Sequence, residues 1–291
     1  MSKHKVLVTG ASGKIASQVL PVFRDRYDLT LLDVTAIGRT GNEIENIRTG
    51  NEVEDIQIAD LCNPDRETYR HHFRGIDAVV HFGYVRVDRK AREAHFRAEM
   101  QNIQMAYNIY QTALEENVRR VVVTSSNHAA DFYESHILSG RLDVVHPDDT
   151  ALAVGFYGWA KASYEHLGFV YALGQQTDKP LENIQIRIGG PREIDITERV
   201  NPGDLKGMRR ALGAYLSERD MQQLYIKSIE TEDIRNEHGV PFQIFYGVSR
   251  NHHNFWSLSN ACAVIDYTPE DNSEVRFADQ IAEHIRASKK A

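Results

Sequence analysis

Tyr157 and Lys161 are the two residues whose types and spacing most directly suggest chemistry. They stand four apart in a segment, Gly155 to Gln175, whose pattern predicts a helix, so they share one helix face. A free phenol has a pKa of roughly 10 and is a weak base at neutral pH. An ammonium group beside it favours the phenolate and lowers that pKa. The spacing suggests a tyrosine base, although a core tyrosine and a surface lysine also show it by chance.

A second group of polar residues follows a predicted strand, Arg120 to Thr124. Ser125 and Ser126 come directly after it, at the carboxyl end where parallel sheets bind their ligands. The Ser126 hydroxyl can hydrogen-bond the substrate oxygen that Tyr157 deprotonates, and Lys161 can also reach the ribose hydroxyls of a cofactor. In this context the Tyr157–Lys161 pair becomes a strong signal.

Asn102 is a further candidate. The helix predicted from Ala91 to Asn117 carries its large apolar residues on one stripe, and Asn102 lies off that stripe. Asparagine is mildly unfavourable inside a helix. A catalytic role and a solvated side chain are both open for Asn102.

The element that could position a cofactor lies near the start of the chain. Lys5 to Thr9 is a β-branched run typical of a buried parallel strand, and a helical pattern begins at Ile15. Gly10 between them allows a tight turn, and Gly13 lets a pyrophosphate approach the backbone. Free N–H groups and the helix dipole then favour the anion. Strand, glycine turn and helix together predict a dinucleotide site.

Acidic and glycine residues end the next strands. Asp33 closes the second predicted strand, where a carboxylate can bind the adenosine ribose and repel a 2′-phosphate, which favours NAD over NADP. Asp60 closes the third strand and either meets the adenine or caps the next turn. Gly83 ends the strand Ile76 to Phe82 and lets a cofactor approach. An ordinary turn and an ordinary strand-end aspartate are the alternatives for Gly10 and Asp33.

The alternation of strands and helices predicts an α/β fold, a Rossmann doubly wound parallel sheet. We expect residues 1–191 to form the NAD-binding domain and residues 192–291 a small C-terminal substrate lobe. In that second part the pattern predicts one helix from Leu212 to Ile229 and a strand from Pro241 to Tyr246, so elements of the lobe return to the main domain. Ala129 to Gly155 is predicted to be a long loop.

Composition narrows the function classes. A net charge of −7 over 291 residues argues against a general nucleic-acid binder. Cys62 and Cys262 lie far apart without metal or redox spacing, which favours a reducing compartment, the cytoplasm. The first strand begins too early to leave room for a signal peptide, and no apolar run reaches transmembrane length. The paired histidines have no supporting ligand spacing, so we expect no metal and no membrane or nucleic-acid partner.

The sequence resembles the extended short-chain dehydrogenase/reductase superfamily over essentially its whole length. Within it, the chain is similar to the uronate dehydrogenases and equally to the archaeal NAD-dependent hexose-6-phosphate dehydrogenases. The matching pieces are Thr9-Gly-Ala-Ser-Gly-Lys-Ile-Ala16, Asp60-Leu61, Val80-His-Phe-Gly83, Asn102, Ser125-Ser-Asn-His128, Phe156-Tyr-Gly-Trp-Ala-Lys161, Ile186-Arg-Ile-Gly189 and Asp266-Tyr-Thr-Pro-Glu-Asp-Asn-Ser273.

The resemblance implies roles for named residues. It makes Ser126, Tyr157 and Lys161 catalytic, with Asn102 beside them. The cofactor contacts that it implies are Gly10, Ser12, Gly13, Lys14, Ile15, Asp33, Asp60, Leu61, Phe82, Gly83, Tyr157, Lys161 and Ile188. The sugar contacts are Tyr84, Ser126, Asn127, His128, Gly190 and Arg210, the last of which would hold a substrate carboxylate at the start of a helix.

Two departures from the family pattern concern the substrate. Tyr84 stands where the relatives usually have glycine, and the segment Ile194 to Met208 is longer than expected. The resemblance also implies that the helices Ala91–Asn117 and Tyr157–Gln175, which carry more apolar residues than one face needs, pair across a two-fold axis. We therefore expect a homodimer or a higher homo-oligomer.

Three functions fit these observations. The first is NAD-dependent oxidation of a sugar or sugar acid, a hexuronate or hexose phosphate, at C1 to a lactone. The second is a nucleotide-sugar epimerase or dehydratase that recycles its NAD, but such enzymes usually need a larger C-terminal lobe. The third is a protein that senses NAD without chemistry, which the presence of both Tyr157 and Lys161 disfavours.

Overall fold

The computed structural model describes residues 3–38, 55–192, 200–201 and 203–288. Its centre is one sheet of seven parallel strands in the order β3-β2-β1-β4-β5-β6-β7. The predicted α/β Rossmann architecture is confirmed. The strands are β1 (Lys5–Thr9), β2 (Asp28–Asp33), β3 (Ile56–Ile58), β4 (Ala78–His81), β5 (Arg120–Ser126), β6 (Glu182–Ile188) and β7 (Phe242–Gly247).

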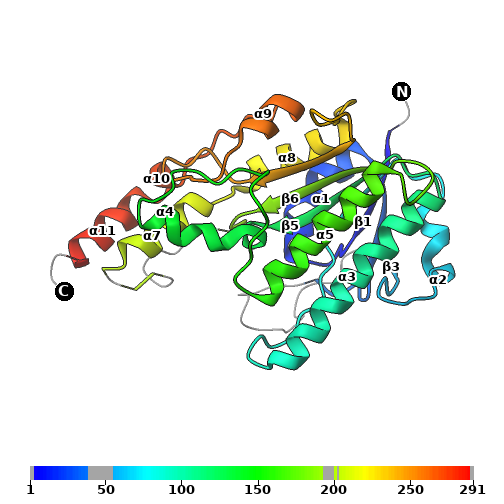
Figure 1. The fold of residues 1–291 in the computed structure, drawn as a ribbon, viewed down its shortest axis with the longest axis horizontal. Coiled ribbons are helices and arrows are strands. Elements are labelled where there is room, and N and C mark those ends of the chain that lie inside the picture. The colour runs from blue at the N-terminus through cyan, green and yellow to red at the C-terminus, as the bar shows by residue number, and fades with distance from the viewer. Residues whose placement is uncertain (1–2, 39–54, 193–199, 202, 289–291) are drawn as a thin grey trace.

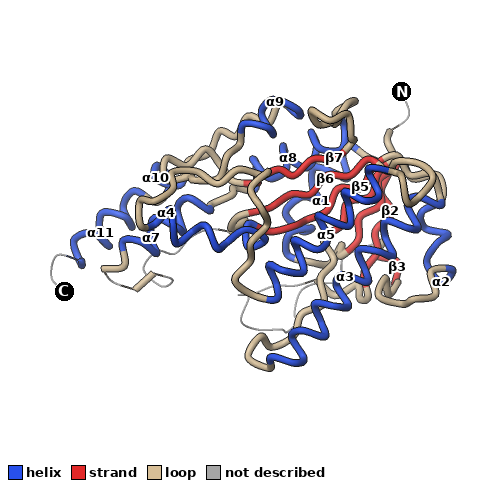
Figure 2. Tube along the Cα trace, viewed as in Figure 1, coloured by secondary structure: helices blue, strands red, loops and turns tan. Residues whose placement is uncertain are grey.

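Helices cover both faces of this sheet (Figure 2). Val6 and Val8 of β1 point to one face, where they pack with α1 (Lys14–Arg26), α8 (Glu218–Glu230) and α9 (Ser259–Ile265). Leu7 points to the other face, against α2 (Glu67–Arg70), the 3₁₀ turn η1 (His71–Phe73), α3 (Arg92–Glu115) and α5 (Phe156–Leu173). Successive strand residues point to opposite faces, so a sheet buried on both needs the continuous apolar runs that the sequence contains.

The strand order reverses direction between β1 and β4, which lie side by side at the centre. From β1 the chain moves outward to β2 and β3, then returns to β4 and continues to β7. Ligands of open parallel sheets bind at the carboxyl ends of the strands beside such a reversal. Gly10 and Gly83 follow β1 and β4 at this point, so the topology puts both glycines in the crevice.

The single helix predicted from Leu212 to Ile229 is wrong, because the structure divides this stretch into α7 (Leu205–Ala214) and α8. Tyr215 leaves the helical path and forms a parallel bridge with Gly190. Ser217 then caps α8, since its hydroxyl oxygen accepts from the Asp220 N–H at 3.1 Å. Apolar residues continue at helical spacing across this break, which is why the periodicity did not reveal it.

Several short helices gather at one end of the molecule, beyond the carboxyl ends of β5 to β7 (Figure 1). They are the 3₁₀ segment η2 (Asn127–Tyr133), α4 (Glu134–Leu138), α7, α10 (Ser273–Arg276) and α11 (Ala278–Ser288). The long loop predicted from Ala129 to Gly155 therefore begins with helical turns. Residues 193–199 and 202 lie outside the described residues, so the predicted extra length of the segment Ile194 to Met208 stays a prediction.

This end of the molecule has its own small apolar clusters. One joins Ile137 and Val145 to Trp256, and the other joins Leu212 to Phe277. In contrast, α8, β7 and α9 belong to the main sheet layers, although they follow residue 191. The lobe is thus assembled from segments on both sides of that residue. No helix in the described part of the chain is both long and apolar enough to span a membrane.

Candidate active site

The turn after β1 is built for close approach. Gly10 has φ +71°, a left-handed conformation that favours glycine, and a Cβ there would stand 2.5 Å from the Gly83 backbone nitrogen. The Gly13 N–H donates to the Gly10 carbonyl at 2.9 Å and closes the turn. Gly13 then begins α1 without a side-chain cap, so no side chain competes for the first helix N–H groups. These N–H groups and the helix dipole suit a pyrophosphate.

Asp33 connects this turn to the end of β2. One carboxylate oxygen accepts from the Ser12 N–H at 3.1 Å and from the Ser12 hydroxyl at 2.6 Å, while the other accepts from the Val34 N–H at 2.7 Å. A carboxylate oxygen can accept more than one hydrogen bond. Asp33 can therefore hold the glycine turn and still receive ribose hydroxyls. Ser12 helps to position the Asp33 carboxylate through these two hydrogen bonds.

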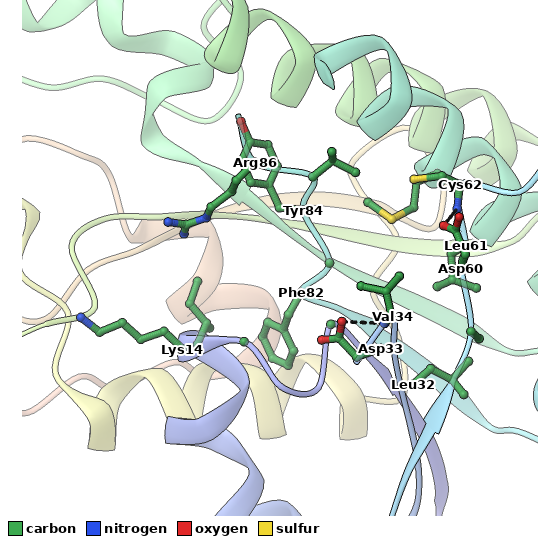
Figure 3. Close-up of a pocket in the computed structure, with 17 residues that line it drawn as sticks. Lys14, Leu32, Asp33, Val34, Asp60, Leu61, Cys62, Phe82, Tyr84 and Arg86 are labelled. Atoms are coloured by element: carbon green, nitrogen blue, oxygen red, sulfur yellow. Dashed lines mark hydrogen bonds between the residues drawn. The ribbon is translucent and has the colours of Figure 1, made fainter. Parts of the chain in front are cut away.

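A cavity of about 300 Å³ opens between these elements (Figure 3). The lining includes nine of the predicted cofactor residues, namely Gly10, Gly13, Lys14, Ile15, Asp33, Asp60, Leu61, Phe82 and Gly83. Asp60 also accepts from the Cys62 N–H at 2.9 Å, so it both caps its turn and borders the cavity. Figure 3 shows Lys14 and Arg86 on one side of the cavity and Asp33 and Asp60 on the other. The side with Lys14 and Arg86 thus suits a polyanion, and the side with Asp33 and Asp60 suits a polyol.

Tyr157 and Lys161 lie on the first turns of α5, as predicted. Lys161 is buried, and its ammonium group donates to the Thr124 carbonyl at the end of β5 at 2.8 Å. Its Nζ atom is 5.8 Å from the centre of the Tyr157 ring and 5.3 Å from that of Tyr84. Three groups surround the Tyr157 ring: Tyr84 at 5.4 Å, His128 at 5.8 Å and the Arg89 guanidinium at 4.7 Å.

Burial has the largest effect on the pKa values of Tyr157 and Lys161. It raises the pKa of Tyr157, and the charges and donors that oppose the rise are Ser126, Arg89 and Arg86 rather than Lys161. The predicted lowering of the Tyr157 pKa by Lys161 is not among these causes and stays a prediction. Burial also lowers the pKa of Lys161 to about 8, against the opposing effect of the Glu99 and Glu165 carboxylates. Lys161 thus keeps its proton at neutral pH.

Ser126, Asn127 and His128 stand at the end of β5, facing the start of α5. The Ser126 hydroxyl oxygen accepts from the His128 N–H at 3.2 Å, and the hydroxyl opposes the rise in the pKa of Tyr157. The Nδ2 atom of Asn127 is buried and has no protein partner among the described residues. The His128 ring contacts Asp131 at 2.8 Å. Gly158 makes the approach possible, because a Cβ there would collide with the His128 carbonyl.

The loop after β4 is held by a fully buried carboxylate, Glu99 of α3. Glu99 accepts from the Tyr84 hydroxyl, contacts His95 at 3.2 Å and accepts from the Asn102 amide at 3.3 Å. Asn102 in turn accepts from the Val85 N–H at 2.7 Å and donates to the Val85 carbonyl at 3.1 Å. The structure thus uses Asn102 to fix the loop that carries Tyr84. Asn102 positions this loop, and its catalytic role stays a prediction.

Two predicted substrate residues are engaged elsewhere. Arg210 lies in the second turn of α7 and not at its start, and it makes a two-pronged ion pair with Glu134, with both bonds at 3.0 Å. The Gly190 N–H donates to the Ala214 carbonyl at 2.6 Å and is not free for a ligand. The buried Ile188 ends β6 beside Ser126, as expected for the wall of the crevice.

Sequence reasoning missed four residues of this region: Arg86, Arg89, Glu99 and Cys62. The two arginines had a signal, since they follow the end of β4 within a few residues, at the reversal of strand order. Glu99 had none, because its partner Tyr84 comes from another part of the chain. Cys62 lines the cavity, and burial raises the pKa of its thiol to about 11, so the thiol is unreactive at neutral pH.

A family model described as the NAD dependent epimerase/dehydratase family matches residues 6–172. The chain belongs to this family. The cofactor of the family is NAD, and the residues present fit it: the Gly10 turn leaves no room for a Cβ, α1 begins without a side-chain cap, and Asp33 ends β2. The predicted resemblance to this superfamily is confirmed.

Individual relatives of the family cover almost the whole chain. A uronate dehydrogenase of Pseudomonas syringae pv. tomato is 28% identical over 94% of this chain and 84% of that protein. An NAD-dependent glucose-6-phosphate dehydrogenase of Haloferax volcanii is 28% identical over 92% of this chain and 94% of that protein. The crystal structure of uronate dehydrogenase from Agrobacterium tumefaciens superposes with a TM-score of 0.71 at 25% identity, covering 97% of this chain and 90% of that one.

Proposed function

We propose that this protein oxidises a sugar at C1 to the lactone, with NAD as the acceptor, and that a hexuronate or a hexose phosphate is the substrate. The observation that carries the proposal is the pairing of Tyr157 and the buried Lys161 at the reversal of strand order. The names of the two relatives support the substrate class, since one acts on a uronate and the other on glucose 6-phosphate.

The chain's own groups divide the work. Tyr157 takes the proton of the C1 hydroxyl as the general base, and the Ser126 hydroxyl holds the same oxygen. Lys161 supplies a positive charge on the α5 face beside the phenolate and can hold the ribose of the cofactor. When bound, NAD supplies the ring that accepts the hydrogen and electron pair leaving C1. Asn127 and His128, and on the family resemblance Tyr84, are proposed to contact the sugar.

NAD itself is proposed to lie along the central cavity. The N–H groups of the Gly10–Ile15 turn and Lys14 would hold its pyrophosphate, and Asp33 its ribose. Leu61, Phe82 and Gly83 line the same cavity and support this placement. A carboxylate at residue 33 disfavours the 2′-phosphate of NADP.

The proposal is tested by incubating the enzyme with NAD and a panel of hexoses, hexuronates and hexose phosphates while NADH is recorded. Net NADH formation with a stoichiometric lactone is the expected result. Interconversion of sugars without NADH would identify the epimerase or dehydratase alternative. Binding of NAD with no turnover of any sugar would identify a sensor.

We further propose a homodimer in the cytoplasm. Large apolar side chains lie exposed on the α3–α5 face, among them Phe96 at 41% and Trp159 at 39% of full exposure. The two helices lie side by side (Figure 1), so this face is continuous. Cys62 and Cys262 carry free thiols, which supports the reducing compartment predicted from their spacing.

A further inference from the structure

The loop Tyr84–Lys90 carries two arginines to the catalytic tyrosine. It leaves the end of β4 at the reversal of strand order, and Asn102 fixes it by two hydrogen bonds to Val85. Arg86 borders the cofactor cavity (Figure 3). Arg89 reaches further, with its guanidinium carbon 4.7 Å from the centre of the Tyr157 ring. Arg86 therefore borders the cofactor cavity, and Arg89 lies against the proposed base.

Neither arginine is neutralised within the described part of the chain. No carboxylate of residues 3–38, 55–192, 200–201 or 203–288 forms an ion pair or hydrogen bond with Arg86 or Arg89, whereas Arg210 is paired with Glu134. Both arginines are exposed on their loop. An accessible arginine beside a reaction centre can bind an anion, because its planar fork is suited to a carboxylate or phosphate.

The negative charges near Tyr157 do not neutralise Arg86 and Arg89. A carboxylate that acts on Tyr157 is Glu99, which is buried and already accepts from the Tyr84 hydroxyl and the Asn102 amide. It also faces the ammonium group of Lys161. The region in front of Tyr157 is thus cationic, although the whole protein has a net charge of −7. A local excess of positive charge on an acidic protein attracts an anionic ligand to that place.

We propose that Arg86 and Arg89 form the subsite for the anionic end of the substrate, so that the ligand is an aldose carrying a terminal carboxylate or phosphate. This inference rests on the proposed function, because the sugar must place C1 at Tyr157 while its charged end meets the arginines. It moves the anion site from Arg210, whose guanidinium is already engaged, to the loop after β4. Carboxylate and phosphate both match the planar guanidinium of arginine, and the experiment distinguishes between them.

The test measures equilibrium binding of three sugars, glucuronate, glucose 6-phosphate and glucose, to the enzyme saturated with NADH. Isothermal titration calorimetry is used, since no turnover is then required. Arg86→Gln and Arg89→Gln, alone and together, are compared with the parent protein. The control, Arg92→Gln, removes the same charge from an exposed arginine at the start of α3. Arg210→Gln tests the competing site.

The double variant should raise the dissociation constant of the anionic sugar by about tenfold or more, since a charge-assisted hydrogen bond contributes on that order. Glucose affinity and NADH affinity should change by less than about twofold, and Arg89→Lys should restore part of the loss. Preference between glucuronate and glucose 6-phosphate in the parent protein identifies the anion.

Three results would overturn the proposal. Equal weakening of glucose and the charged sugars would show that the loop acts only on the fold or on the sugar ring. Weakened NADH binding in Arg86→Gln, with unchanged sugar binding, would assign Arg86 to the cofactor. Loss of anion binding only in Arg210→Gln would return the site to α7. A failure of the proposed function is distinguishable, because then the parent protein forms no NADH with any sugar while these binding constants are still measured.

Discussion

Tyr157 is held between groups that oppose each other. Burial raises its pKa, while Ser126, Arg89 and Arg86 favour the phenolate. Tyr157→Phe keeps the ring contacts with Tyr84 and His128 but removes the oxygen. Turnover should fall by roughly a hundredfold or more, since general bases typically contribute that much. NAD affinity, measured by calorimetry, should be nearly unchanged. A variant with near-normal turnover would mean that another group is the base.

His81 gives a pH-dependent prediction at the same scale. It is buried under the loop after β4, where its Nδ1 atom contacts the Thr9 hydroxyl at 2.7 Å. Burial and the Lys161 charge lower its pKa from 6.5 to about 3. Between pH of about 3 and 6.5, the His81 imidazole is therefore protonated in the unfolded chain and neutral in the folded protein. The stability that neutral His81 contributes is fully present above a pH of about 6.5 and is lost as the pH falls towards 3.

The measurement is the free energy of unfolding by urea at several pH values. Within that window His81 should contribute a slope of about 1.4 kcal/mol per pH unit. His81→Asn should reduce the slope by roughly that amount, whatever its effect on stability at neutral pH. An unchanged slope would show that the folded protein accommodates the protonated imidazole.

At the scale of elements, the most demanding contact is between the turn after β1 and the end of β4. Gly10→Ala adds a Cβ 2.5 Å from the Gly83 nitrogen at a positive φ. Gly75→Ala is the matched control, because its φ of +68° is nearly the same and nothing lies within 4 Å of the added atom. The control should lose about 1 kcal/mol of unfolding free energy. Gly10→Ala should lose several times more and should also lose NAD binding. Equal losses in the two variants would mean that Gly10 and Gly83 can move apart without a cost in unfolding free energy.

Sequence reasoning succeeded for elements whose character is local. The strands predicted at Lys5–Thr9, Ile76–Phe82, Arg120–Thr124 and Pro241–Tyr246 agree with the observed bounds within about two residues, because a strand buried on both faces has a continuous apolar run. It failed at Tyr215–Ser217, where a tertiary bridge to Gly190 ends one helix although the apolar pattern continues. It also did not reveal that Arg210 is paired, because its partner Glu134 lies 76 residues away in the chain.

At the scale of the whole molecule, the exposed α3–α5 face is the feature that a second copy would cover. Charge on this face should prevent association, because burying an unpaired carboxylate is costly. Trp159→Glu and Phe96→Glu should therefore give monomers by light scattering. Val275→Glu, on an apolar residue of α10 that is even more exposed, should remain dimeric. A monomeric parent protein would contradict the proposed dimer.

The central claim is that hydrogen leaves C1 of a sugar and stays on the cofactor. It is tested most directly with a hexuronate and a hexose phosphate deuterated at C1, incubated with the enzyme and excess NAD. Mass spectrometry of both products gives the result. Deuterated NADH and lactone are expected in equal amounts, with the label absent from the sugar product. Unlabelled NAD together with an isomerised or dehydrated sugar that retains deuterium would contradict it.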